Sequence, residues 1–367
     1  MPPISVLMKP ASGLCNMHCD YCFYADEQAN RTHENFGFMS ERTLKNIIRR
    51  TLLHAEGAAS FAFQGGEPTL RGLDFFRKVV LYEEQYNKNY LRIQNALQTN
   101  GLLLDREWCV FLRDNHFLVG VSLDGVQAVH DRFRHLNKDC AETAESAFLC
   151  AMEKIRLLRD CNVEFNILTV VTDDLADHIE EVYHFYQQED FRWQQYIACL
   201  DPLEGDAPRS YSLTPKKYQE FLIRLWDLWQ KDPKRPFIRQ FDNWVGMIAG
   251  YPPEACDMRG ICGIQYVCEA DGSVYPCDFY MTDQYCLGNF NSDRIDAVDE
   301  KRNAIAFIEN SMKLPGKCLS CKWLKLCRGG CRRNRDEMQL NRFCGSYSGL
   351  FEARVEDMKH EAARIRE

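Results

Sequence analysis

Short apolar runs alternate with amphipathic stretches from residue 4 to about residue 200. The runs contain many β-branched and aromatic residues, and most end in turn residues such as Gly, Pro or Asp, which is typical of buried β-strands. Six runs are predicted as strands: ISVLMKP (4–10), SFAFQGGEP (60–68), LRIQNALQTNG (91–101), LVGVSLDG (118–125), EFNILTVVT (164–172) and RWQQYIACL (192–200).

Between these strands the apolar residues recur at helical spacing. The predicted helices are SERTLKNIIRRTLLHAE (40–56), DFFRKVVLYEEQY (74–86), REWCVFLRDN (106–115), AETAESAFLCAMEKIRLLRD (141–160) and LADHIEEVYHFYQQE (175–189), with Ser40, Asp105 and Asp174 as N-caps. Strict alternation predicts an α/β fold with a parallel sheet, covered by helices and functional at the carboxyl edge of its strands. Six such units predict a partial (β/α)6 barrel resembling part of a TIM barrel.

The alternation stops near residue 200. A turn-rich linker (201–215), a helix (216–232) and a shorter helix (241–250) precede a stretch rich in Cys, Gly and Arg (256–344). Within that stretch QYVCEADGSVYPCDFY (265–280) predicts a hairpin that turns at Asp271 and Gly272. We expect the barrel with its linker helix over residues 1–235, a cysteine-rich domain over 236–347 and a C-terminal helix over 348–367.

Charge and cysteine content narrow the class of protein. A net charge of −8 gives no chain-wide basic field, so nucleic acid is not an expected partner. No apolar run of membrane-spanning length and no signal peptide is evident, which predicts a cytoplasmic protein without a membrane partner. Eighteen cysteines in such a chain indicate metal binding rather than disulfides. Isolated cysteines are expected to be small core residues: Cys109, Cys140, Cys150, Cys161 and Cys199.

The first cysteine cluster is KPASGLCNMHCDYCFYADE, in which Cys15, Cys19 and Cys22 follow the first strand with x3 and x2 spacing. Three thiolates leave one position of a four-ligand site open for a cofactor or substrate. A structural zinc site completed by His18 or His33 is the alternative.

The second cluster offers enough thiolates for two four-ligand sites, and four thiolates suit zinc or an iron–sulfur cluster equally well. Its candidate ligands are Cys256, Cys262, Cys277, Cys318, Cys321, Cys327, Cys331 and Cys344. Cys268 and Cys286 fall outside the regular spacing.

These motifs resemble the radical S-adenosylmethionine superfamily, whose Cys-x3-Cys-x2-aromatic-Cys loop holds a [4Fe–4S] cluster; Tyr21 takes the aromatic position. In that superfamily the open iron binds S-adenosylmethionine. CGIQYVCEADGSVYPC (262–277) and CLSCKWLKLCRGGC (318–331) resemble the SPASM domain, which implies two auxiliary [4Fe–4S] clusters and three in all. The resemblance implies one auxiliary cluster on Cys256, Cys262, Cys277 and Cys331, and the other on Cys318, Cys321, Cys327 and Cys344.

Within this superfamily the chain is most similar, end to end, to the anaerobic sulfatase-maturating enzymes, through FAFQGGEPTL, LQTNG, CLDPL, DGSVYPCDFY and CRGGCRR. The resemblance implies oxidation of a Cys or Ser of a sulfatase peptide (C/S-x-P-x-R) to Cα-formylglycine. It implies cofactor contacts at Tyr21, Gly65, Gly66, Glu67, Ser122 and Arg134, peptide contacts at Tyr24 and Gln64, and a base at Asp278. Gln195 departs from the family, where an apolar residue is expected against the adenosyl group.

Taken alone, the glycine pair would be a tight turn, Arg134 a solvated charge and Asp278 a capping carboxylate. The expected partners are an unfolded or nascent sulfatase polypeptide and an electron donor such as flavodoxin or ferredoxin. The rival hypotheses are a SPASM peptide maturase that forms thioether or carbon–carbon crosslinks and, in another class, a non-catalytic zinc-binding scaffold.

Overall fold

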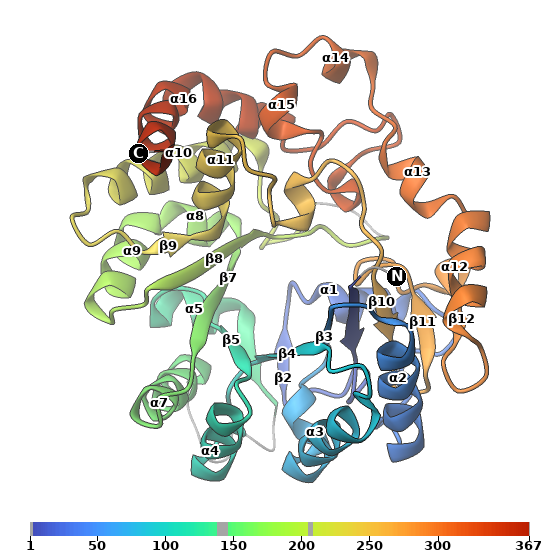
Figure 1. The fold of residues 1–367 in the computed structure, drawn as a ribbon. Helices are drawn as coiled ribbons and strands as arrows, with labels where there is room; N and C mark the ends of the chain where they lie inside the picture. Colours follow the sequence, from blue (N-terminus) through green and yellow to red (C-terminus); the bar gives the residue numbers. More distant parts are fainter. Residues whose placement is uncertain (1–2, 138–145, 205–207, 367) are drawn as a thin grey trace.

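The computed structural model describes residues 3–137, 146–204 and 208–366 and is built around a ten-stranded sheet of order β12-β11-β10-β1-β3-β4-β5-β7-β8-β9 (Figure 1). Pairing is parallel from β10 across to β9 and antiparallel for β10–β11 and β11–β12. The carboxyl ends of the barrel strands therefore meet at one edge.

All six predicted barrel strands are confirmed: β1 (Ile4–Met8), β3 (Ala58–Phe63), β4 (Arg92–Thr99), β5 (Leu118–Ser122), β7 (Phe165–Val171) and β8 (Trp193–Ala198). Their apolar side chains are largely buried; Phe61, Val119 and Val121, for example, have no exposed surface. A separate pair, β2 (Met17–Cys19) and β6 (Arg134–Leu136), lies outside the main sheet.

Helices cover the outside of the sheet (Figure 1). They are α2 (Glu41–His54), α3 (Leu73–Tyr86), α4 (Arg106–Asp114), α5 (Gln127–Phe133), α7 (Ala147–Asp160), α8 (Asp173–Asp177) and α9 (Ile179–Gln188), whereas α1 (Phe23–Ala29) directly follows the cysteine loop. Ser40 and Asp105 cap α2 and α4 as predicted. The predicted cap at Asp174 is wrong, because Thr172 accepts the bond from the Leu175 amide and Asp174 lies inside α8. The single helix predicted over residues 175–189 is replaced by two separate helices, α8 and α9.

The C-terminal helix α16 (Cys344–Arg366) packs against α10 (Pro215–Lys231) and α11 (Arg239–Ala249). It begins at residue 344, earlier than the predicted 348. Aromatic rings form much of this contact; the centroids of Trp244 and Phe351 are 5.5 Å apart. The predicted linker before α10 includes residues 205–207, which lie outside the described residues.

The predicted hairpin is present as β10 (Tyr266–Cys268) and β11 (Ser273–Tyr275), and Gly272 at its turn has a φ of +94°. The hairpin continues the barrel sheet because β10 pairs in parallel with β1. At the other edge β9 (Phe237–Ile238) pairs with β8. The sheet thus continues on both sides of the expected boundary near residue 235.

The remaining elements of the cysteine-rich part are short: β12 (Gly288–Asn289), α12 (Ile295–Ala304), α13 (Phe307–Ser311), α14 (Gly316–Leu319) and α15 (Leu324–Cys327). Short 3-10 turns occur at Pro68–Arg71, Cys256–Met258, Asp283–Tyr285 and Arg332–Asn334. Of the isolated cysteines, Cys109, Cys161 and Cys199 are buried and Cys150 is partly buried, whereas Cys140 lies outside the described residues.

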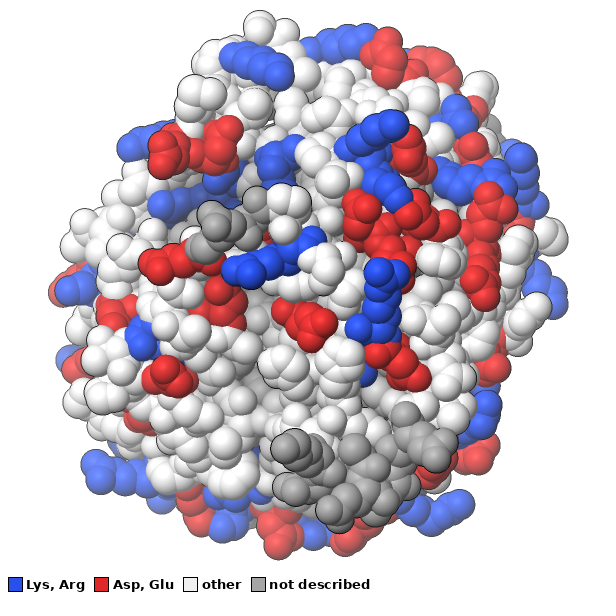
Figure 2. Space-filling model, turned by 180° about the vertical axis from the view of Figure 1, so that it is seen from behind, with Lys and Arg blue, Asp and Glu red and all other residues white. Residues whose placement is uncertain are grey.

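Two surface properties concern the expected partners. Within the described chain, no helix combines the length and the apolar character needed to cross a bilayer. On the face shown in Figure 2, basic and acidic side chains are intermixed rather than gathered into one large area of a single sign.

Candidate active site

A pocket opens at the carboxyl edge of the barrel strands and brings together the predicted residues of the N-terminal half. Its lining includes Cys15, Cys19, Tyr21, Cys22, Tyr24, Gln64, Gly65, Gly66, Glu67, Ser122 and Arg134. The pocket also receives Phe279, which follows Asp278 in the segment after β11. The barrel and the cysteine-rich part therefore meet at one site.

The loop after β1 places three cysteines on one wall of this pocket. Burial raises the pKa of Cys15 to about 12, and the charges of Glu67, Cys19 and Cys22 raise it as well, so these groups are close together. The side-chain amide nitrogen (Nδ2) of Asn100 lies 3.9 Å from the Cys15 sulfur. Three thiols around an open pocket fit the [4Fe–4S] interpretation.

A single-ion site is not found at this loop. His18 and His33, the residues proposed to complete a zinc site, are exposed and do not line the pocket. Across the described residues, no three His, Cys, Asp or Glu side chains converge where one metal ion would bind. A zinc ion needs such convergence because its bonds to sulfur are only about 2.3 Å long.

The QGGEP turn after β3 packs directly against the cysteine loop. Gly66 has a φ of +51°, and a Cβ there would lie 2.3 Å from the carbonyl oxygen of Leu14. Only glycine fits this approach. Glu67 is fully buried, and its carboxylate accepts bonds from Thr69, from the Thr99 hydroxyl (2.7 Å) and from the Asn100 amide (2.8 Å). The Glu67 carboxylate therefore ties the turn to the end of β4.

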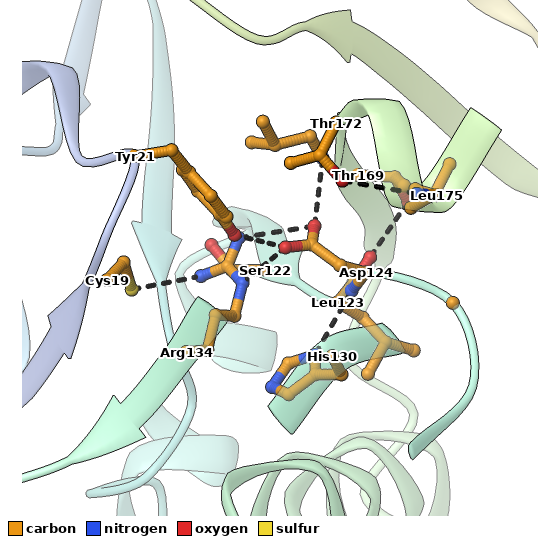
Figure 3. A network of polar contacts seen from close by, with 12 residues as sticks. Cys19, Tyr21, Ser122, Leu123, Asp124, His130, Arg134, Thr169, Thr172 and Leu175 are labelled. Carbon is orange, nitrogen blue, oxygen red and sulfur yellow. Dashed lines mark hydrogen bonds and ion pairs between the residues drawn. The ribbon is translucent and has the colours of Figure 1, made fainter. Parts of the chain in front are cut away.

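Arg134 belongs to a buried polar network beside the cysteine loop (Figure 3). Its Nε donates to the Asp124 carboxylate at 2.8 Å, and one terminal nitrogen lies 3.9 Å from the Cys19 sulfur. The Tyr21 hydroxyl donates to the same carboxylate. Antiparallel pairing of β2 with β6 sets Cys19 opposite Arg134. Arg134 is therefore a buried, paired charge rather than a solvated one.

Electrostatic interactions keep the Asp124–Arg134 pair of this network ionised. Burial acts to raise the pKa of the Asp124 carboxyl, but the charge and hydrogen bond of Arg134, with smaller effects of His130 and Tyr21, together hold the pKa below its usual range. Burial and the Arg134 charge lower the pKa of His130 to about 4. A neutral His130 is consistent with its Nδ1 accepting the Asp124 backbone N–H at 3.1 Å.

Asp124→Ala is expected to destabilise the protein by about 3–5 kcal/mol, because it leaves the Arg134 cation buried without its partner. The measurement is equilibrium unfolding in urea. Asp74→Ala is the control, since Asp74 pairs with Arg77 on the surface with 88% of its side chain exposed, and exposed pairs contribute about 0–1 kcal/mol. Equal stability losses in the two variants would contradict this interpretation of the network.

Part of the pocket lining is apolar. Leu168 and Val170 from β7 and Ile197 from β8 line it. Gln195, the position at which the chain departs from the family, instead borders a second hollow with Leu118 and Trp193. An apolar face is therefore available to an adenosyl group although Gln195 is polar.

Asp278 does not line the pocket but is joined to it through Gln64, whose Nε2 donates to Asp278 Oδ2 at 2.9 Å. The other carboxylate oxygen pairs with the buried ammonium of Lys9. The Tyr24 ring lines the pocket, whereas its hydroxyl donates to Glu269. The Tyr24 hydroxyl is therefore already engaged by a buried carboxylate.

Four cysteines of the C-terminal cluster influence one another and so lie close together. Burial raises the pKa of Cys277 well above its usual value, and Cys331 and Cys256 raise it further. Burial also raises the pKa of Cys331 to about 12, with additional effects of Cys256 and Cys262. This group coincides with the first ligand set implied by the resemblance.

The other four cysteines form a second group. Burial raises the pKa of Cys327 to about 11, and the charges of Cys344, Cys318 and Cys321 raise it further. Cys268 is fully buried on β10 and belongs to neither group, as expected. The Cys286 thiol donates to the carbonyl oxygen of Gly288.

Family models match the barrel and part of the cysteine-rich domain. The radical SAM superfamily matches residues 10–186, and SPASM, an iron–sulfur cluster-binding domain, matches residues 262–322. Together with the partial barrel and its cysteine-lined pocket, these matches define a radical S-adenosylmethionine enzyme. Such an enzyme uses a [4Fe–4S] cluster with S-adenosylmethionine, and its SPASM domain binds further iron–sulfur clusters.

Curated relatives show which family of radical S-adenosylmethionine enzymes the chain resembles. A cysteine-type anaerobic sulfatase-maturating enzyme of Clostridium perfringens is 43% identical over 96% of each chain, and one of Clostridium novyi is 40% identical over 100% of this chain and 99% of its own. A serine-type enzyme of Bacteroides thetaiotaomicron is 32% identical over 95% of this chain and 89% of its own. The chain belongs to the family of anaerobic sulfatase-maturating enzymes.

Solved structures agree with this assignment. The structure described as native anSMEcpe with bound AdoMet and Cp18Cys peptide has a TM-score of 0.92 and 42% identity, and the match covers 99% of this chain and 100% of that one. Streptococcus suis SuiB bound to its precursor peptide SuiA shares the fold at 16% identity and a TM-score of 0.63, over 93% of this chain and 75% of that chain.

Four buried charged residues near the site were not predicted from the sequence: Lys9, Arg31, Asp124 and Glu269. Asp124 lies at the end of the strand predicted over residues 118–125, next to the carboxyl edge where a functional site was expected. Lys9 was visible as a charge at the end of an otherwise apolar strand. No local sequence signal indicated that Glu269 would face Tyr24.

Proposed function

We propose that this enzyme oxidises a cysteine or serine side chain of a sulfatase peptide to Cα-formylglycine. The observation that carries the proposal is the link, through Gln64, between the three-cysteine pocket of the barrel and Asp278 of the cysteine-rich part. A [4Fe–4S] cluster held by Cys15, Cys19 and Cys22 would, together with S-adenosylmethionine, supply the radical chemistry that removes one hydrogen atom from the peptide Cβ.

The reaction then requires removal of one more proton and one electron. We assign the removal of this proton to Asp278, whose buried carboxylate accepts a hydrogen bond from Gln64 in the pocket lining. Cys277, the neighbour of Asp278, belongs to the first auxiliary ligand set, so an electron acceptor would lie beside the base. For a cysteine the product of both removals is a thioaldehyde, and water then replaces sulfur to give the aldehyde.

The pocket residues have separate tasks in this proposal. Cys15, Cys19 and Cys22 hold the first cluster, and Tyr21, Gly65, Gly66, Glu67, Ser122 and Arg134 surround the cofactor by contact or by positioning. Tyr24 and Gln64 meet the peptide. The two C-terminal cysteine groups hold the auxiliary clusters.

Cysteine peptides are the proposed preferred substrate, because the cysteine-type relatives are 40–44% identical and the serine-type relatives only 29–32%. The partner is an unfolded or nascent sulfatase in the cytoplasm, since the reacting side chain has to reach the pocket. An electron carrier such as flavodoxin or ferredoxin completes the system.

The test is mass spectrometry of two synthetic peptides, Cys-x-Pro-x-Arg and Ser-x-Pro-x-Arg, after anaerobic incubation with reconstituted enzyme, S-adenosylmethionine and a reductant. Aldehyde together with 5′-deoxyadenosine, with faster conversion of the cysteine peptide, is the expected result. Deoxyadenosine without aldehyde would favour the crosslinking maturase instead. Iron analysis separates the enzyme, with about twelve irons for three filled clusters, from an iron-free zinc scaffold.

A further inference from the structure

Lys9 is a buried cation at the centre of the site. It follows β1, and its side chain has no exposed surface (0%). Full burial of a lysine is rare unless its charge is paired. Its acidic partner is Asp278, and its ammonium also lies 4.0 Å from the centroid of the Tyr24 ring. Of the other buried carboxylates nearby, Glu269 is paired with Arg31 at 2.8 Å, and Glu27 accepts the Met281 backbone N–H at 2.9 Å.

The fold leaves room for this lysine at a particular place. A Cβ on Gly65 would lie 2.0 Å from Lys9 Cδ and 2.9 Å from Lys9 Nζ. The Lys9 side chain therefore passes through the space that a side chain at Gly65 would fill. The first glycine of the QGGEP turn is thus explained by the passage of Lys9 as well as by its own φ of +95°.

The two oxygens of Asp278 have different partners. Lys9 holds Oδ1 from the buried side, and Gln64, which lines the pocket, donates to Oδ2 at 2.9 Å. A carboxylate held by one donor can turn about its Cβ–Cγ bond, whereas two donors on different oxygens fix its plane. A carboxylate oxygen has two acceptor sites, so Oδ2 keeps one after bonding to Gln64.

We propose that Lys9 is a positioning residue for the oxidation: it fixes the Asp278 carboxylate so that Oδ2 faces the reacting side chain of the peptide. This inference rests on the proposed function of Asp278. It assigns no contact with the substrate to Lys9, which acts through Asp278. If Lys9 had only a structural role, it would anchor the segment after β11 to β1. Its loss would then not change the amount of aldehyde formed per 5′-deoxyadenosine.

The experiment compares Lys9→Met, which removes both charge and donor, with Lys9→Gln, which keeps a donor. Lys216→Met is the matched control, since Lys216 lies on α10 with 88% of its side chain exposed. Each reconstituted enzyme is given the cysteine peptide, and aldehyde formed per 5′-deoxyadenosine is the readout. Iron content and the thermal midpoint are measured on the same samples.

We expect the aldehyde yield per deoxyadenosine to fall about tenfold or more in Lys9→Met, because small misplacements of a reacting group can cost up to about a hundredfold. Lys9→Gln should recover most of the yield, and Lys216→Met should match the unaltered enzyme. In an Asp278→Asn background, Lys9→Met should cause no further fall, because the two residues act as a unit.

Several outcomes would overturn the inference. A Lys9→Met enzyme with an unchanged ratio, or one in which both products fall in proportion, would leave Lys9 a structural role only. If Lys9→Met does not fold, a Lys9→Gln enzyme in which aldehyde and 5′-deoxyadenosine fall in proportion would equally leave Lys9 a structural role only. Failure of the unaltered enzyme to make aldehyde would contradict the proposed function instead.

Discussion

Cys19→Ala is expected to abolish formation of 5′-deoxyadenosine, with a loss of about a thousandfold or more, because without the radical the reaction has only its uncatalysed rate. Cys19 is one of three thiols on the pocket wall, and its sulfur faces Arg134 at 3.9 Å. Two remaining thiolates do not hold a cluster that needs three protein ligands. Iron should therefore fall from about twelve to about eight atoms per chain.

The control is Cys109→Ala, which changes a buried cysteine on α4 that is not part of any cluster motif. It should keep its iron and its deoxyadenosine. The measurements are iron and sulfide analysis of anaerobically reconstituted protein and chromatography of the nucleoside product. A Cys19→Ala enzyme that retains full iron content and full cleavage would contradict the assignment of the first cluster.

Asp278→Asn is expected to lower aldehyde formation by at least about a hundredfold while 5′-deoxyadenosine is still produced, since a positioned base contributes about 10²–10⁴-fold. The cysteines of the pocket are untouched, so the iron content should stay the same. Asp283→Asn is the control; Asp283 lies five residues later and bonds to Thr32 at the surface. Near-normal aldehyde yield would remove Asp278 from the mechanism.

Stability has to be measured alongside, because Asp278→Asn also leaves the buried Lys9 without an acidic partner. Loss of one member of a buried pair costs about 3–5 kcal/mol. The double variant Lys9→Met with Asp278→Asn removes this unpaired charge and should recover part of the lost stability without recovering the aldehyde. Thermal unfolding of the single and double variants separates the two effects.

The barrel could be predicted from sequence because its strands and helices have strong local patterns. Each barrel strand is a distinct run of apolar residues, and Ser40 and Asp105 are ordinary helix caps. The cap at Thr172 was missed because Thr172 ends the preceding strand pattern, and Asp174 is an equally good capping type. The early start of α16 was hidden because Cys344 was assigned as a ligand and not as a helix residue.

The candidate site could be predicted only in part. Cysteine spacing and the glycine pair are local signals, and the pocket contains the residues they indicate. The pairs Lys9–Asp278 and Tyr24–Glu269 join residues more than two hundred positions apart. Nothing in a single sequence specifies such partners. The parallel pairing of β10 with β1 was missed for the same reason, since three-residue strands carry almost no pattern.

The pairing of β10 with β1 also sets the order in which a newly synthesised chain can be completed. β1 leaves the ribosome well before its partner on one side, residues 266–268. Until those residues emerge, β1 presents an unpaired strand edge, which is a template for aggregation. The segment that carries Asp278 follows that partner directly. Pairing of β1 with β10 and placement of Asp278 beside the cysteine loop can therefore occur only after all the barrel strands have been synthesised.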